Sequence, residues 1–336
     1  CPAPRGDGVA AAAPSVAALQ GRAAALPGFE AALFAPSGTQ TNLIALWGHC
    51  QRGDEAIVGQ SWHTYRWEAG GMAVLGSIQP QPVETQPDGT LRLADIAAAI
   101  KPDDPHFART RLVVLENTTG GQVLPPEYVA EVAQLARQRG LALHLDGARL
   151  FNAATANAAR RGTDVYQEAR ELASHFDSVS VCLSKGLGAP VGSLVLGSAA
   201  FIRQARRTRK ILGGGMRQAG VLAAAGHYAL QHHVRRLAED HANLHTLASG
   251  LRAVGENHPV LRGRITVHPW QTNILFTDVQ ADVAPAFTAW LAQHQIRVTS
   301  SLYGGQSRLR WVTHLDVNAA DVQAALDCVA RFTLPG

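Results

Sequence analysis

The sequence predicts an α/β fold: a large domain on a mostly parallel sheet, followed by a small C-terminal α+β domain. Short β-branched runs alternate with helix-like segments over most of the chain, which is typical of successive β-α units. The length of 336 residues exceeds that of one ordinary domain. With 46% hydrophobic and 17% charged residues, the composition is that of a globular protein.

The predicted elements follow in chain order. A helix at 37–50 begins with Ser and Thr caps, and one at 125–140 has Pro at its start and Gly at its end. A single long helix from about 216 to 252 is predicted to link the domains. Strands of the large domain are predicted at 55–59, 111–116, 141–146, 178–184 and 191–197. The C-terminal part is predicted to hold strands at 272–279 and 308–314 and a helix at 319–332.

These elements divide the chain into three predicted parts. Residues 1–25 form an atypical, alanine-rich N-terminal segment, 26–230 the large domain, and 231–336 the linking helix with the small domain. There is no internal repeat.

Composition argues against several classes of function. The formal charge is only +4, and the one basic cluster, at 203–210, belongs to no nucleic-acid-reading motif. No apolar run approaches the roughly 20 residues of a membrane span, and the start lacks the pattern of a secretory signal. The four cysteines are far apart and lack metal-ligand spacing, which favours reduced thiols in an intracellular protein. We therefore expect a cytoplasmic protein without nucleic-acid partner, membrane or metal.

Polar residues mark the ends of several predicted strands, where open α/β sheets bind ligands. Ser-Gly-Thr at 37–39 precedes a helix, and a helix N-terminus is a ready anion site. His144 and Asp146 lie on one face of a strand because side chains repeat every two residues. Taken alone, each has an ordinary explanation: a helix cap, a core histidine, a turn residue, a solvated strand end. The further polar residues at strand ends are His63, Arg149, Ser184 and Lys185.

An anion cradle, an acid and a lysine at separate strand ends are together what an aldehyde cofactor such as pyridoxal phosphate requires. A lysine amine can form a Schiff base with the aldehyde. A carboxylate keeps the pyridine nitrogen protonated, so that the ring acts as an electron sink. An arginine can hold an amino-acid carboxylate by a bidentate, charge-assisted pair.

The sequence resembles the low-specificity L-threonine aldolases, which are pyridoxal-phosphate enzymes of the aspartate-aminotransferase type (fold type I). The resemblance covers about nine-tenths of the chain. The longest motifs that carry it are "LHLDGARLFNA" (143–153), "CLSKGLGAPVGS" (182–193) and "RKILGGGMRQAGVLAAAG" (209–226). Shorter ones are "PSGTQTN" (36–42), "HTYRWEAGG" (63–71), "ENTTGG" (116–121) and "WVTHLDV" (311–317).

The resemblance implies a role for each matching residue. Lys185 would carry the Schiff base, Asp146 would pair with the pyridine nitrogen, and His63 would stack on the ring and take the proton of the substrate hydroxyl. The substrate carboxylate would be held by Arg149, which also lines the cofactor site, and by Arg310, while Thr119 would lie near the β-substituent. The phosphate would be held by Gly38, Thr39 and Ser184, with Lys210 and Arg217 supplied by a neighbouring subunit.

The implied reaction is retro-aldol cleavage of L-threonine, L-allo-threonine and other β-hydroxy-α-amino acids to glycine and an aldehyde. The implied assembly is a homotetramer, a dimer of dimers with sites at the dimer interface.

The sequence also departs from the family. The serine-bearing segment with which family members begin has no counterpart, and residues 10–13 are alanines where the family has Tyr, Gly and acids. Thr119 stands where the family has a histidine. Two alternatives therefore stay open: a related β-eliminating lyase or racemase, and a cofactor-binding protein with impaired activity. A dinucleotide dehydrogenase is not favoured, because no G-x-G-x-x-G follows the first strand.

Overall fold

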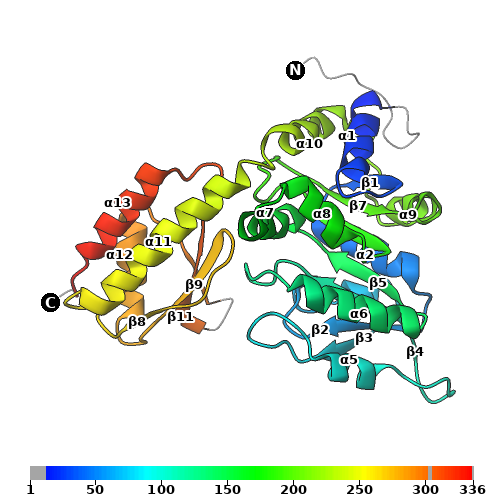
Figure 1. Cartoon of the computed structure of the whole chain (residues 1–336), viewed down its shortest axis with the longest axis horizontal. Coiled ribbons are helices and arrows are strands. Elements are labelled where there is room, and N and C mark those ends of the chain that lie inside the picture. The colour runs from blue at the N-terminus through cyan, green and yellow to red at the C-terminus, as the bar shows by residue number, and fades with distance from the viewer. Residues whose placement is uncertain (1–12, 302–304, 335–336) are drawn as a thin grey trace. The chain divides into compact units, whose positions relative to one another are not determined.

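The computed structural model describes residues 13–301 and 305–334 of the chain. They form two compact units (Figure 1). The larger unit holds the chain up to Thr119 and Val123–Arg235, and the smaller holds Gly120–Gln122 and the chain from Arg236 onward. Most of the alanine run at 10–13 lies outside the described residues.

The larger unit is built on a seven-stranded sheet in the order β1-β7-β6-β5-β4-β2-β3. Every neighbouring pair is parallel except those of β7, which runs antiparallel to both β1 and β6. The mostly parallel sheet is therefore confirmed. The strands are β1 (Ala31–Ala35), β2 (Asp54–Gly59), β3 (Gln79–Val83), β4 (Arg109–Glu116), β5 (Ala142–Asp146), β6 (Ser178–Cys182) and β7 (Ser193–Gly197).

Helices follow most of the strands. The predicted helix at 37–50 is α2, which starts after Ser37, whose hydroxyl accepts a hydrogen bond from the backbone N–H of Gln40. The predicted helix at 125–140 is α6, with Pro126 at its first turn. The helices of this unit are α1 (Pro14–Ala25), α2 (Gly38–His49), α3 (His63–Arg66), α4 (Gly71–Val74), α5 (Leu93–Ala99), α6 (Pro126–Gln138), α7 (Leu150–Arg161), α8 (Val165–Ala173), α9 (Ala199–Ile211) and α10 (Gly220–His232).

The core of the larger unit encloses β6 and β7, although β6 alternates serine with valine. Every residue of β6 and β7 is buried, as expected for strands covered on both faces. α2 and α9 pack against the β1–β7 side of the sheet, through a cluster of Leu33, Ala35, Ile44, Ala45, Val195, Ile202 and Ala205. The alanine-rich α1 is part of this unit, because Leu19 is fully buried and α1 contacts both β1 and α10.

The single helix predicted over 216–252 is wrong. The chain forms α10, a four-residue turn at 233–236, and then α11 (Leu237–Asn257). The two arginines of the turn pair within different units: Arg235 with Asp164 at 2.6 Å, and Arg236 with Asp240 of α11. The helix therefore breaks where the chain passes from one unit to the other, and neither Gly nor Pro marks the place.

The smaller unit is an antiparallel sheet in the order β10-β11-β9-β8 with three helices. Its core includes Phe287, Trp311 and Phe332. The predicted helix at 319–332 is α13, which begins with a capping box between Asn318 and Asp321. The elements are α11, β8 (Ile265–Val267), β9 (Ile274–Val279), α12 (Ala284–Gln293), β10 (Thr299–Ser301), β11 (Gly305–Val312) and α13 (Ala319–Ala330). No described helix of either unit is long and apolar enough to cross a membrane.

Candidate active site

The carboxyl ends of six strands meet at one edge of the larger sheet. β1 to β6 all run in the same direction, because β7 is antiparallel to both of its neighbours and the other pairs are parallel. The segments that follow these strands carry the predicted site residues of the larger unit, except Lys210 and Arg217. This is the edge at which open α/β sheets bind ligands.

Asp146, the last residue of β5, is the centre of a buried polar cluster. One of its oxygens accepts from the Nδ2 of Asn42 at 2.9 Å, and the other from the backbone N–H of Ala148 at 3.1 Å. The same Asn42 nitrogen donates to Oε1 of Glu68 at 2.8 Å. Asp146 and Asn42 are only 3% and 2% exposed, so these bonds fix both side chains.

His63 starts the short helix α3 and pairs with Glu68. Its Nδ1 lies 2.9 Å from Oε1 of Glu68, whose side chain is 5% exposed against 38% for His63. This hydrogen bond raises the pKa of His63, burial opposes it, and the charges of Asp146 and Lys185 act with opposite signs. Burial in turn raises the pKa of Glu68. With Nδ1 donating to Glu68, a neutral His63 carries its lone pair on Nε2, which is the atom available as a base.

Glu116, at the end of β4, holds the backbone of the same helix. Its Oε2 accepts from the backbone N–H of His63 at 2.5 Å. Burial, followed by the charge of Asp146, raises the pKa of Glu116 to about 8. Three residues on, the hydroxyl of Thr119 donates to the carbonyl of Glu116 at 3.0 Å. Thr119 is half-buried, and the single hydrogen of its hydroxyl is engaged in this bond.

Lys185 lies in the turn of the β6–β7 hairpin and is half-buried. The turn is held by a bond from the N–H of Gly188 to the carbonyl of Lys185 at 2.9 Å and one from Leu183 to Gly192 at 3.0 Å. Gly192 has a φ of +108°, and a Cβ there would lie 2.4 Å from the ring of Phe34. The charge of Lys185 lowers the pKa values of both His63 and Glu116, which places its ammonium group near them.

The first turn of α2 meets the start of this hairpin. A Cβ on Gly38 would lie 2.8 Å from Sγ of Cys182 and 3.6 Å from Oγ of Ser193, so only glycine allows this approach. Thr39 and Ser184 are both exposed. The N-terminus of α2, with the exposed hydroxyl groups of Thr39 and Ser184, is suited to binding an anion. The predicted phosphate role of Gly38, Thr39 and Ser184 stays a prediction.

Four other predicted residues lie farther along the chain. Arg149 precedes α7 and is half-buried, while Lys210 ends α9 and Arg217 follows it, both exposed. Arg310 is a half-buried residue of β11 in the smaller unit. Their roles toward phosphate and substrate stay predictions.

The residues present fit pyridoxal phosphate. Three carboxylic acids gather here, those of Glu68, Glu116 and Asp146, with Lys185 and His63 as the basic groups. Such a cluster of acids suits a protonated pyridine nitrogen, which would add positive charge. A lysine and an anion-binding helix end supply the two other anchors that the cofactor needs.

A metal ion fits this cluster less well. Ligand atoms of His63, Glu68 and Asp146 lie within 4.8 Å of one another, close enough to share an ion. The amide hydrogens of Asn42, however, already point at oxygens of both carboxylates, and Nδ1 of His63 is bonded to Glu68. A cation among them would meet hydrogen-bond donors rather than free lone pairs.

Sequence reasoning missed three residues of the cluster: Asn42, Glu68 and Glu116. Asn42 had a signal, since it is a polar residue among the apolar ones of α2. Glu116 ends a strand, as Asp146 does. Glu68 had none, because it follows α3 in irregular structure where spacing does not fix direction.

Two residues of the same strand region keep their ordinary roles. His144 is fully buried and hydrogen-bonded to Ser178, which confirms the core-histidine interpretation. Cys182 is a buried free thiol that accepts from Ser193 at 3.3 Å.

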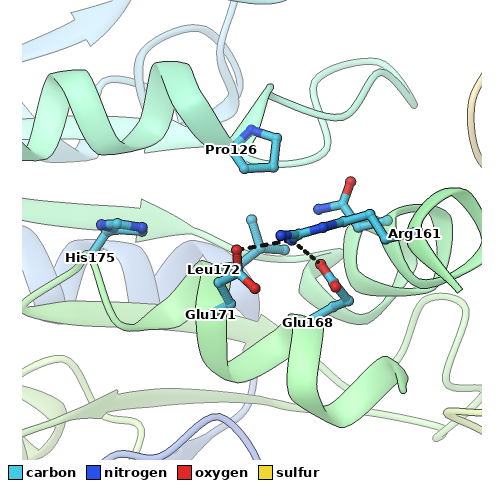
Figure 2. Close-up of a pocket in the computed structure, with 7 residues that line it drawn as sticks. Pro126, Arg161, Glu168, Glu171, Leu172 and His175 are labelled. Carbon is cyan, nitrogen blue, oxygen red and sulfur yellow. Dashed lines mark hydrogen bonds and ion pairs between the residues drawn. The ribbon is translucent and has the colours of Figure 1, made fainter. Parts of the chain in front are cut away.

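Figure 2 shows a second cavity of the larger unit that contains none of the predicted site residues. There Arg161 pairs with Glu168 at 3.1 Å and with Glu171 at 2.9 Å, and Pro126 and His175 also line the cavity. At about 10 Å³ it has room for one water at most. It is an ion-pair network that ties α7 to α8, not a substrate site.

Comparison with known proteins agrees with this geometry. Residues 1–282 match the family described as beta-eliminating lyase. The low specificity L-threonine aldolase of Escherichia coli (strain K12) is 50% identical over 316 residues, covering 94% of this chain and 88% of that protein. Low-specificity L-threonine aldolase 1 of Arabidopsis thaliana is 41% identical over 345 residues, covering 99% and 91%.

Solved structures share the fold. A Leishmania major threonine aldolase superposes with a TM-score of 0.75 at 24% identity, covering 94% of this chain and 88% of that one. A Sphingomonas wittichii serine palmitoyltransferase gives 0.70 at 18% identity, covering 94% and 75%. At these identities the likeness speaks for the fold, and it confirms the predicted fold type I. Taken with the sequence matches, it makes this chain a member of the beta-eliminating lyase family, in the branch of the low-specificity L-threonine aldolases.

Proposed function

We propose that this protein is a carbon–carbon lyase that cleaves L-threonine, L-allo-threonine and other β-hydroxy-α-amino acids to glycine and an aldehyde, with pyridoxal phosphate as cofactor. The observation that carries the proposal is the His63–Glu68 pair beside Asp146 and Lys185. Its relatives are named for the same activity.

Each side chain of the cluster has a task in this reaction. Lys185 would hold the cofactor through its amine, Asp146 would face the pyridine nitrogen, and the α2 N-terminus would hold the phosphate. When bound, the cofactor stores the electron pair left on the substrate Cα as the bond to Cβ breaks. Arg149 and Arg310 would hold the substrate carboxylate.

His63 would take the proton from the substrate hydroxyl. Its Nδ1–H is bound to Glu68, so its free lone pair lies on Nε2. The raised pKa makes that nitrogen a stronger base than an ordinary imidazole. Its side chain is 38% exposed, which leaves it open to the substrate. Loss of the hydroxyl proton expels the aldehyde and completes the cleavage.

A second candidate is β-elimination on the same fold. It is considered because Thr119 stands where the family has a histidine. Such a reaction would give ammonia and a 2-keto acid instead of glycine and an aldehyde.

Product analysis tests both candidates. The full chain, loaded with pyridoxal phosphate, is given L-threonine, L-allo-threonine and phenylserine in turn. Acetaldehyde with equimolar glycine from threonine supports the aldolase. Ammonia with 2-oxobutanoate, without glycine, would support the second candidate, and no turnover of any substrate would favour a cofactor-binding protein with impaired activity.

The assembly and location are part of the proposal. We place the enzyme in the cytoplasm as a homotetramer, with Lys210 and Arg217 reaching the phosphate of a neighbouring subunit. Both side chains are exposed. We also propose that 26–230 act as the cofactor-binding domain and 231–336 as the small domain, after an N-terminal segment at 1–25.

A further inference from the structure

A line of hydrogen-bonded side chains runs from a half-buried residue of the larger unit into the carboxylate cluster. It begins at His49, the last residue of α2, whose Nε2 lies 2.7 Å from Oγ of Ser178. Nδ1 of His144 lies 2.8 Å from the same oxygen, and its Nε2 lies 3.4 Å from Oδ1 of Asn42. Asn42 then donates to Asp146 and Glu68.

The line is buried over most of its length. Ser178 and His144 are fully buried, and Asn42 is 2% exposed. Burial lowers the pKa of His144 to about 3 and that of His49 to about 4. Both imidazoles are therefore neutral near pH 7. Each carries one N–H hydrogen, which lies on either Nδ1 or Nε2.

The carboxylates decide where these hydrogens lie. Both amide hydrogens of Asn42 are used, one toward Asp146 and one toward Glu68, so its Oδ1 can only accept. The Nε2 of His144 must then be the donor. This leaves the lone pair of His144 on Nδ1, which accepts from the hydroxyl of Ser178.

The same reasoning reaches His49. Once the Ser178 hydroxyl hydrogen is given to His144, its oxygen is free to accept from Nε2–H of His49. Every donor in the line therefore points toward the carboxylates.

The opposite placement is unfavourable. A proton on Nδ1 of His144 would bind the backbone carbonyl of Ser178, 3.1 Å away. The Nε2 lone pair would then face Oδ1 of Asn42, acceptor against acceptor. Turning the amide would cost Asn42 both of its bonds to the carboxylates, and a buried polar atom left unpaired is costly.

We propose that His49, Ser178 and His144 are positioning residues of the active site. They fix the rotational state of Asn42, which in turn holds Asp146 for the pyridine nitrogen and Glu68 for His63. None of the three touches the substrate. The inference rests on the proposed function, because it assigns the support of that same site.

Histidine ¹⁵N NMR of the full chain without cofactor tests the placement of the hydrogens. The His144 signals are assigned by their loss in His144→Asn. We expect the Nε2–H form, without titration, from about pH 5 to pH 8. An Nδ1–H form, or protonation in that range, would overturn the proposal whether or not the protein cleaves threonine.

Ser178→Ala tests the consequence for the site. Without its hydroxyl, Nδ1 of His144 faces only the Ser178 carbonyl, so we expect the Nδ1–H form in this variant. The Kd for pyridoxal phosphate, titrated by tryptophan fluorescence, should rise about fivefold, the effect of one neutral hydrogen bond. Thr155→Val is the matched control, since Thr155 is also buried and its hydroxyl donates to the carbonyl of Phe151, outside the line. It should change neither readout.

Two variants of His49, the half-buried residue at which the line begins, keep the test decisive if Ser178→Ala fails to fold. His49→Phe removes the donor but keeps a ring to stack on Phe201, now 4.8 Å away. His49→Gln restores an N–H donor. We expect His144 to keep its Nε2–H form in both variants, because Oδ1 of Asn42 can still only accept, while the cofactor Kd rises in His49→Phe and recovers in His49→Gln. An unchanged cofactor Kd in His49→Phe, or an Nδ1–H form of His144 in His49→Gln, contradicts the proposal.

Discussion

Glu68→Gln should lower the pKa of His63. The carboxylate accepts two hydrogen bonds through one oxygen, from Nδ1 of His63 at 2.9 Å and from Nδ2 of Asn42 at 2.8 Å. Glutamine keeps that oxygen and the side-chain shape, so the substitution removes the charge and little else. The hydrogen bond to Glu68 is the main cause of the raised pKa of His63. The substitution weakens this bond because glutamine is uncharged.

The size of the change follows from the difference between charged and neutral hydrogen bonds. A bond to a charged group is worth about 1.5–3 kcal/mol and a neutral one about 1, so about 1 kcal/mol is lost. Because the His63 side chain is 38% exposed, solvent screening reduces this further. We expect the pKa of His63 to fall by about half a unit to one unit.

Both stability and activity should follow. A histidine with a raised pKa stabilises the fold below its ordinary pKa, and this contribution is lost as the pH rises through the folded value. The variant should therefore lose stability mainly on the acid side. The acid limb of kcat/KM should move to lower pH, since His63 acts in its neutral form, and the plateau should fall a few-fold because the base is weaker.

A proton NMR titration of the His63 ring, assigned with His63→Gln, gives the pKa directly, and pH–rate profiles give the kinetic limb. Glu171→Gln is the control: Glu171 pairs with Arg161 away from the cluster, so His63 should titrate as in the unchanged protein. An unchanged or higher pKa of His63 in Glu68→Gln would refute the pairing.

Three further outcomes are expected. Lys185→Ala should abolish both the visible absorbance of the bound cofactor and turnover; a borohydride-reducible adduct in the variant would exclude Lys185 as the anchor. Arg310→Ala should raise KM by about 10- to 100-fold, the worth of one charge-assisted carboxylate contact, and an unchanged KM would remove it from the site. Gly192→Ala should lower the free energy of unfolding by about 2–4 kcal/mol, because φ is +108° and the new Cβ meets Phe34. Gly140→Ala isolates the backbone part, since φ is +65° there with no atom within 4 Å; equal losses measured by urea unfolding would contradict the clash.

The strands were predictable where β-branched and apolar residues are grouped, as at 112–115 of β4. The edge strand β3, with Pro80 and Pro82, was not predicted, since prolines argue against a strand unless it lies at an edge. The break between α10 and α11 was missed because no Gly or Pro marks it; the chain passes there from one unit to the other.

The candidate site divides in the same way. Asp146 and Lys185 could be found because strand ends are visible in the sequence. The pairing of Glu68 with His63 could not, because it depends on the path of the chain through the one-turn helix α3 and the irregular residues after it. The direction of the bonds from His49 to Asn42 depends on contacts between residues more than a hundred positions apart.

The pairing of β1 with β7 has a consequence for how the protein is made. Ala31 pairs with Gly197, so the first strand has no neighbour in the sheet until more than half of the chain has left the ribosome. Contacts this distant in sequence form late in folding. Until then the apolar segment Ala31–Ala35 is exposed, and the helix it leads to, which begins at Gly38, has not met the hairpin that bears Lys185. The nascent chain thus exposes this apolar segment until β7 has formed, and the N-terminus of α2 meets the β6–β7 hairpin only after that step.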